Sequence, residues 1–148
     1  MLRRAVFPLA AIVIALLHFS CGSSESIESV TPKGLDFFFC NYWEDQNQDG
    51  VIQPKEWVGI KDTFRVSERL EFVGEITGKK GAKVQFKLLD PERVVVKADE
   101  QVAGEDTYLG RYSFEPYDLF KKGGAGRYSV EWYVNGNLIR RLDLTLLN

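Results

Sequence analysis

The sequence predicts an all-β domain that folds as an antiparallel β-sandwich. Hydrophobic residues alternate with polar ones in several short runs, and no segment shows a long helical period. Turn signals recur about every 8 to 12 residues, which is typical of a sandwich. Aromatic residues make up 13% of the chain, and such a content favours a compact β core over a helical bundle.

Length and composition restrict the function classes. The chain has 148 residues, enough for one domain of ordinary size. It is 45% hydrophobic and 27% charged, which excludes a disordered chain and an integral membrane protein by composition. The formal net charge is −2, and without Arg3 and Arg4 it would be −4. Because no block of lysine or arginine is present, we expect no nucleic-acid partner.

The N-terminus predicts export. A basic start at residues 1–4 precedes an apolar run at residues 5–17. This run is shorter than the roughly 20 residues of a membrane-spanning helix, so we interpret residues 1–20 as a secretory signal peptide. The alternative is an uncleaved N-terminal anchor, and the remainder of the chain is exported in either case.

The residues after the apolar run resemble the lipobox of bacterial lipoproteins. Ser20 and Cys21 match this motif, whereas His18 and Phe19 depart from it. The resemblance implies that Cys21 is acylated and anchors the protein to a membrane of the bacterial cell envelope. The alternative is cleavage near Ser20 with a free Cys21.

Residues 21–34 are predicted to be a polar tether, because Ser-rich residues follow Cys21. The sandwich domain is then expected at residues 35–148. If Cys21 is acylated, Cys40 has no partner for an internal disulfide. We expect Cys40 to be a small buried hydrophobic residue, although a bridge to a free Cys21 stays open.

In the middle of the domain, period-two alternation predicts strands at residues 70–76 and 83–88. Residues 78–81, Gly-Lys-Lys-Gly, are interpreted as a hairpin turn between them. A third strand is expected at residues 93–98. Residues 99–106 and 123–124 are expected to be polar loops.

Near the C-terminus, alternation at residues 128–134 predicts a strand, and Asn135-Gly136 predicts a tight hairpin. The last strand places Leu142, Leu144 and Leu146 on one face. The run 126–132 resembles the penultimate strand of bacterial immunoglobulin-like domains. That resemblance covers the last third of the chain. It implies an immunoglobulin-like β-sandwich in which Tyr128 is tied back to the preceding corner.

Residues 45–56 resemble the twelve-residue calcium loop of EF-hand proteins. Calcium takes six to eight hard oxygen ligands, so acidic and amide side chains must converge from alternate positions. The resemblance implies these ligands: Asp45, Asn47, Asp49, the carbonyl of Val51, Gln53 directly or through water, and Glu56 with both oxygens. Gly50 stands at the sharp turn and Ile52 is expected to pack inward. The alternative is a polar loop whose side chains cap their own backbone.

The segments on either side of this loop differ from an EF-hand. Gly59 follows closely, so at most one helical turn can start at Pro54. The segment 37–43 fits both helical and strand templates, and its aromatic content favours a strand. No second loop is present to pair with this one. We therefore predict one calcium loop inserted in a β domain, where it fixes a loop rather than opening a groove.

The sequence does not predict an enzyme. His18 is the only histidine and lies in the signal peptide, so histidine-based catalytic or zinc sites are excluded. Trp43 and Trp57 bracket the loop, and we expect both to be buried, as we do Trp132. The function predicted is a binding or structural module for an envelope protein. If Trp43 and Trp57 were exposed, they would instead suggest a carbohydrate-binding module with a glycan partner.

Overall fold

The computed structural model describes residues 29–148, so the signal peptide, Cys21 and most of the predicted tether lie outside the described residues. The described elements are the strands β1 (Phe37–Cys40), β2 (Tyr42–Trp43), β3 (Trp57–Val58), β4 (Thr63–Arg65), β5 (Leu70–Thr77), β6 (Lys83–Leu89), β7 (Val95–Val102), β8 (Thr107–Phe114), β9 (Gly126–Val134) and β10 (Asn137–Leu147), the 3-10 turn η1 (Pro54–Glu56) and the helix α1 (Pro116–Gly123).

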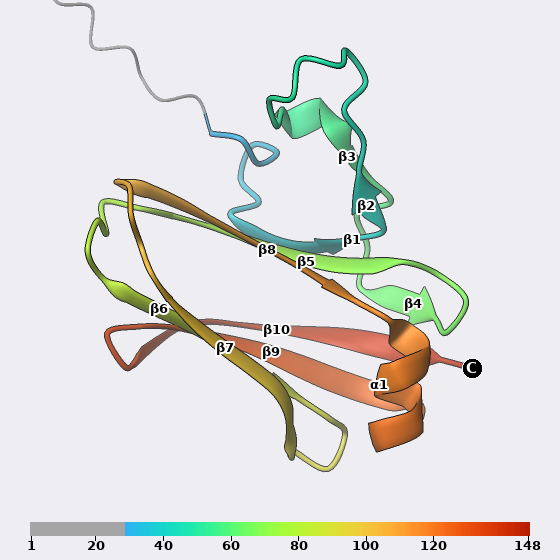
Figure 1. Cartoon of the computed structure of the whole chain (residues 1–148). Coiled ribbons are helices and arrows are strands. Elements are labelled where there is room, and N and C mark those ends of the chain that lie inside the picture. Colours follow the sequence, from blue (N-terminus) through green and yellow to red (C-terminus); the bar gives the residue numbers. More distant parts are fainter. Residues whose placement is uncertain (1–28) are drawn as a thin grey trace, which may run out of the picture.

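Two sheets pack face to face and confirm the predicted sandwich (Figure 1). The first sheet has the order β1-β5-β8, and the second has the order β4-β10-β9-β6-β7. Neighbouring strands are antiparallel, except that β4 runs parallel to β10. The part of the chain before β5 therefore contributes to both sheets, since β1 belongs to the first sheet and β4 to the second.

The inward faces of the two sheets carry the main core. Trp132 on β9 is fully buried, and its indole ring is surrounded by Phe37, Phe72 and Tyr112 of the first sheet and Phe86 of the second. The side chains that the alternation of β6 and β9 assigns to the interior are buried, as predicted. On β10 the same holds for Leu144 and Leu146, while Leu142 is half-buried.

Tyr128 forms the corner that the resemblance to immunoglobulin-like domains implies. Its hydroxyl lies 2.9 Å from the carbonyl oxygen of Leu119 and 2.8 Å from that of Gly124. Both carbonyls belong to the connection that holds α1, directly before β9. Desolvation by burial raises the pKa of this hydroxyl, with Asp90 adding to the effect. Together with the two-sheet order, this corner assigns the domain to the immunoglobulin-like sandwiches.

The turn at residues 78–81 is not a hairpin, contrary to the prediction. β5 pairs with β1 and β8, whereas β6 pairs with β9 and β7. Residues 78–81 therefore carry the chain from one sheet to the other. Alternation of hydrophobic residues specifies which face of a strand is buried, but it does not specify the neighbouring strand.

Two further boundaries differ from the prediction. Residues 99–102 belong to β7, which begins at Val95, so only residues 103–106 form the predicted polar loop. β7 is an exposed edge strand, and edge strands carry charges that conceal the alternation. Gly123 is the last residue of α1 rather than part of a loop. By contrast, the hairpin at Asn135-Gly136 is confirmed, since their φ angles are 49° and 80°.

Candidate functional site

The predicted calcium loop belongs to a small layer that covers the outer face of the first sheet (Figure 1). We call residues 41–60, which include β2, η1 and β3, the cap. A second hydrophobic cluster joins the cap to the sheet; its members are Phe38, Cys40, Trp57 and Val73, with Trp43, Ile52 and Leu109 packed against them. Both faces of β5 are therefore buried, whereas the sequence predicts only one.

The base of the cap is a two-stranded ribbon. Tyr42 lies opposite Val58, and Trp43 lies opposite Trp57. The ribbon is closed by a backbone hydrogen bond of 3.0 Å from Glu44 N to Glu56 O. The predicted single turn from Pro54 is confirmed as η1. Segment 37–43 is extended as predicted, but a bend at Asn41 divides it into β1 and β2. Ile52 packs against the cluster, which confirms its inward position.

Glu56 is the central polar residue of the cap, and its side chain is completely buried. Its Oε2 accepts hydrogen bonds from Trp43 Nε1 at 3.1 Å and from the backbone N of Gln53 at 3.0 Å. Its Oε1 accepts one from the backbone N of Gln46 at 3.2 Å. The carboxylate thus ties the incoming strand, the start of the loop and the end of the loop together.

The exposed part of the loop holds its acidic side chains against its own backbone. Asp45 accepts from Asp49 N at 3.2 Å and from Gly50 N at 2.8 Å. Asp49 accepts from Val51 N at 2.7 Å, from Asn47 Nδ2 at 2.8 Å and from Gln53 Nε2 at 3.1 Å. Gly50 has a φ of 73°, which confirms that the sharp turn falls at this glycine.

These hydrogen bonds show which oxygen atoms of the predicted ligands keep a free lone pair for a calcium ion. A carboxylate oxygen that accepts one N–H group keeps a second lone pair for a cation. Asp45, Asn47, the Oδ1 atom of Asp49 and the Val51 carbonyl therefore suit an ion that prefers hard oxygen ligands, and all four residues reach the surface. Glu56 points into the cap instead. Within residues 29–148, no group of three or more acidic, histidine or cysteine side chains has a spacing that could hold a metal ion. Both oxygens of Glu56 accept hydrogen bonds within the cap, and its role as a metal ligand stays a prediction.

The two tryptophans of the cap do not form an exposed platform. Trp57 is 6% exposed, packs edge-on against Phe38 and donates a hydrogen bond from Nε1 to Val30 O at 3.0 Å. Trp43 is half-buried, with the guanidinium of Arg111 5.4 Å from its ring centroid. The buried positions predicted for Trp57 and Trp132 are confirmed. A carbohydrate site that needs the open faces of Trp43 and Trp57 is not present in this arrangement.

Cys40 lies beneath the cap with no exposed surface, which confirms that it is a small buried residue. Desolvation raises the pKa of its thiol to about 12, and the nearby charge of Glu71 adds to this effect, whereas Arg111 opposes it. Such a thiol stays protonated near neutral pH and reacts slowly. Cys40 can therefore report when the cap opens.

The outer face of β5 carries two buried acidic residues, Glu71 and Glu75, that the sequence pattern does not reveal. Glu75 accepts three hydrogen bonds at its Oε2, from Ser29 Oγ at 2.9 Å, Thr31 Oγ1 at 2.8 Å and Thr31 N at 3.2 Å. Residues 29–31 of the predicted tether are thereby bound to the domain. Nothing in the alternation of residues 70–76 distinguishes Glu75 from a solvated residue on a strand face.

No helix in residues 29–148 is long and apolar enough to cross a membrane. No protein-family model matches the chain, and neither does any curated protein. An immunoglobulin-like protein of Pseudomonas aeruginosa has a similar solved structure, with 14% identity, a TM-score of 0.44, and coverage of 75% of this chain and 91% of that one.

Another similar structure is the alkylpurine DNA glycosylase AlkC of Pseudomonas fluorescens bound to DNA that contains an abasic site analog. The identity is 18% and the TM-score 0.40, and the match covers 57% of this chain but only 27% of the glycosylase. The assignment to the immunoglobulin-like sandwiches therefore rests on the order of the strands and on the corner at Tyr128.

Proposed function

We propose that this protein is a lipid-anchored component of the bacterial cell envelope, in which an immunoglobulin-like domain acts as a binding or structural module. We further propose that calcium stabilises the cap by binding to the loop 45–56. The proposal assigns the chain no catalytic activity, because residues 29–148 contain no histidine to act with a nucleophile.

One observation carries the calcium proposal. The loop is already folded around its acidic side chains, since Asp45 accepts hydrogen bonds from the backbone of both Asp49 and Gly50. A folded loop loses little conformational entropy when an ion binds. Two carboxylates held close together also repel each other, and a divalent cation relieves this repulsion.

The ligands of such an ion would be Asp45, Asn47, Asp49 and the carbonyl of Val51, with water completing the shell. Gln53 can add its side-chain oxygen, because its amide nitrogen is the atom that donates to Asp49. Two carboxylates instead of three lower the charge of the site. We therefore expect a dissociation constant in the range of extracellular modules, about 0.1 to 1 mM.

Calcium is expected to slow the reaction of Cys40 with a thiol reagent. Labelling of this buried thiol requires the cap to open, and an ion that binds only the closed cap reduces the open population. At ten times its dissociation constant, calcium should slow labelling about tenfold. The rate is measured by mass spectrometry, which assigns the label to Cys40.

Magnesium and the variant Asp45→Asn serve as controls. Magnesium should protect Cys40 much less, because it requires a tight octahedral shell and loses water slowly. In Asp45→Asn, the protection by calcium should largely disappear. The rate without calcium, measured for the same variant, gives the separate effect of losing one of the two hydrogen bonds that the carboxylate accepts from Asp49 N and Gly50 N. Equal labelling rates with and without calcium in the wild type would rule out a calcium-stabilised cap.

The anchor is expected on Cys21. Ser29 is the first described residue and lies against Glu75, eight positions after Cys21. An extended chain of that length spans at most about 29 Å, so an acyl chain on Cys21 would hold the domain close to the membrane. Cells grown with a radioactive fatty acid should label the wild type and the matched control Cys40→Ala, but not Cys21→Ala. Label on Cys21→Ala, or none on the wild type, would contradict lipidation at this residue.

A further inference from the structure

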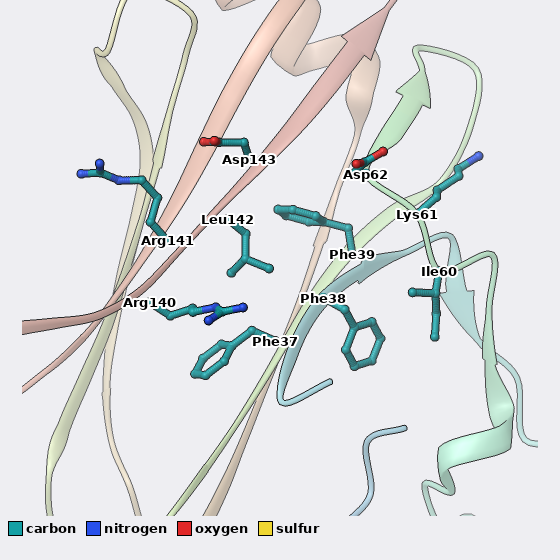
Figure 2. Close-up of a pocket in the computed structure, with 10 residues that line it drawn as sticks. All are labelled: Phe37, Phe38, Phe39, Ile60, Lys61, Asp62, Arg140, Arg141, Leu142 and Asp143. Carbon is teal, nitrogen blue, oxygen red and sulfur yellow. The ribbon is translucent and has the colours of Figure 1, made fainter. Parts of the chain in front are cut away.

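A groove runs between the free edges of the two sheets, and Ile60 at the end of the cap borders it. It lies between β1 and the first half of β10 and encloses about 490 Å³ (Figure 2). The side chains of Phe37, Phe39 and Leu142 line its apolar part. A smaller hollow of about 250 Å³, bordered by Gly34 and Ile139, continues it and shares Phe37 and Arg140 with it.

On the β10 side, the backbone that faces the groove has no strand partner. Thr145 N donates to Asp62 O at 2.7 Å, so the backbone of Thr145 faces β4. Since backbone groups alternate along a strand, Asp143 and Arg141 present their N–H and C=O groups on the same edge. β4 pairs only with Thr145 to Leu147. Within residues 29–148, the outward backbone groups of Arg141 and Asp143 have no backbone hydrogen bond.

On the β1 side, the backbone that faces the groove likewise has no strand partner. Phe39 O accepts a hydrogen bond from Lys61 N at 3.1 Å, so Phe39 faces away from β5. Phe37, two residues earlier, faces the same way, and its N–H and C=O have no backbone partner among the described residues. The groove is thus bordered by main-chain donors and acceptors from two strand edges. An unpaired edge of this kind binds an extended peptide by adding a strand.

The charges along the groove indicate which peptide it suits. Figure 2 shows Arg140 extending between Leu142 and Phe37. Within the described residues, Arg140 takes part in no salt bridge, whereas Arg141 pairs with Glu131 and Lys61 pairs with Glu68. Two carboxylates, Asp62 and Asp143, line the other part of the groove, and Asp143 pairs with Arg127. A guanidinium prefers a carboxylate, which it can bind with two parallel hydrogen bonds.

We propose that the groove between β1 and β10 binds an extended segment of a partner protein, which adds to β10 as a strand and places an acidic side chain on Arg140. This inference rests on the proposed role as a binding module and specifies its partner. The groove residues are distinct from the loop 45–56, so a failure of the calcium proposal leaves this one intact.

The test measures binding of a fluorescein-labelled peptide, acetyl-Val-Thr-Val-Glu-Val-Thr, to the purified full chain by fluorescence anisotropy. A peptide with lysine in place of glutamate should bind more weakly. Arg140→Glu should weaken binding of the acidic peptide about tenfold or more, because it removes a charge-assisted hydrogen bond. Lys80→Glu, which changes the charge by the same amount in the exposed turn at residues 78–81, should not.

Two N-methylated forms of the peptide test the added strand itself. Only alternate N–H groups of a strand face its neighbour. N-methyl groups on the residues whose N–H groups face β10 should abolish binding. N-methyl groups on the residues in between, whose N–H groups point away from β10, should have little effect. Hydrogen exchange at Arg141 and Asp143 should slow when the unmodified peptide binds.

Three results would overturn the proposal. The first is the absence of binding at millimolar peptide. The second is equal binding by the two N-methylated peptides, which would exclude a strand ladder. The third is a concentration-dependent dimer that Arg140→Glu dissolves, which would identify a second copy of the chain as the occupant.

Discussion

Replacement of Glu56 by glutamine is expected to lower the free energy of unfolding by about 3 kcal/mol in the absence of calcium. The buried carboxylate accepts hydrogen bonds from the indole of Trp43 and from the backbone N–H groups of Gln46 and Gln53. An amide has only one acceptor oxygen, and its own N–H groups would face at least one of these donors. A buried donor without a partner costs about 1–3 kcal/mol.

Chemical denaturation measures the loss in global stability, and the labelling rate of Cys40 detects an opening that is confined to the cap. Glu44→Gln is the matched control, because it removes the same charge from an exposed neighbour. It should change stability by less than about 0.5 kcal/mol. If Glu56→Gln left stability and Cys40 labelling unchanged but abolished calcium binding, Glu56 would be a metal ligand, as the EF-hand resemblance implies.

Replacement of Gly110 by valine is expected to destabilise the sandwich by about 3 kcal/mol. Gly110 on β8 lies directly opposite Gly74 on β5. A Cβ atom on Gly110 would lie 2.4 Å from Cη2 of Trp132, and one on Gly74 would lie 2.6 Å from Cζ2 of the same ring. The two glycines therefore make room for the buried indole, which cannot move aside in a close-packed core.

Thermal and denaturant unfolding of Gly110→Val would measure this effect. Gly104→Val is the control, since a Cβ atom at Gly104 meets nothing within 4 Å. It separates the steric clash from the general consequences of replacing a glycine. Equal stability of the two variants would show that the pair Gly74 and Gly110 does not shape the site of Trp132.

The sequence predicted those parts of the fold that depend on local patterns. Alternation placed Val84, Phe86, Val130 and Trp132 in the core, and all four are buried. The pair Asn135-Gly136 forms the predicted hairpin, because few other residues adopt two successive positive φ angles. The corner contacts of Tyr128 could be predicted only through the resemblance to a family, since its partners Leu119 and Gly124 lie in a connection without a recognisable pattern.

The pairing of strands and the third layer could not be predicted in this way. β5 and β6 are consecutive and both alternate, yet they belong to different sheets. The outer face of β5 carries Glu71 and Glu75, which suggest a solvated face, but the cap and residues 29–31 cover it. Burial of such a face depends on contacts between segments that are far apart in the sequence, and a local pattern does not contain this information.

In the candidate site too, some features could be predicted from the sequence and others depend on contacts between distant segments. The turn at Gly50 and the inward position of Ile52, which the resemblance to the EF-hand loop implies, are present. The orientation of Glu56 depends on the strand pair beneath the loop, which brings Trp43 next to Trp57 and places the Trp43 indole at the carboxylate. An EF-hand motif alone does not include that neighbour.

The most direct test of the calcium-stabilised cap is a calorimetric titration of the purified protein with calcium, together with its melting temperature. We expect saturable heat with a dissociation constant of about 0.1 to 1 mM. At tenfold excess the melting temperature should rise by about 5 °C, which corresponds to about 1.4 kcal/mol of linkage. Asp45→Asn should lose both effects. The absence of heat and of a thermal shift at several millimolar calcium in the wild type would show that loop 45–56 is a polar turn closed by its own hydrogen bonds.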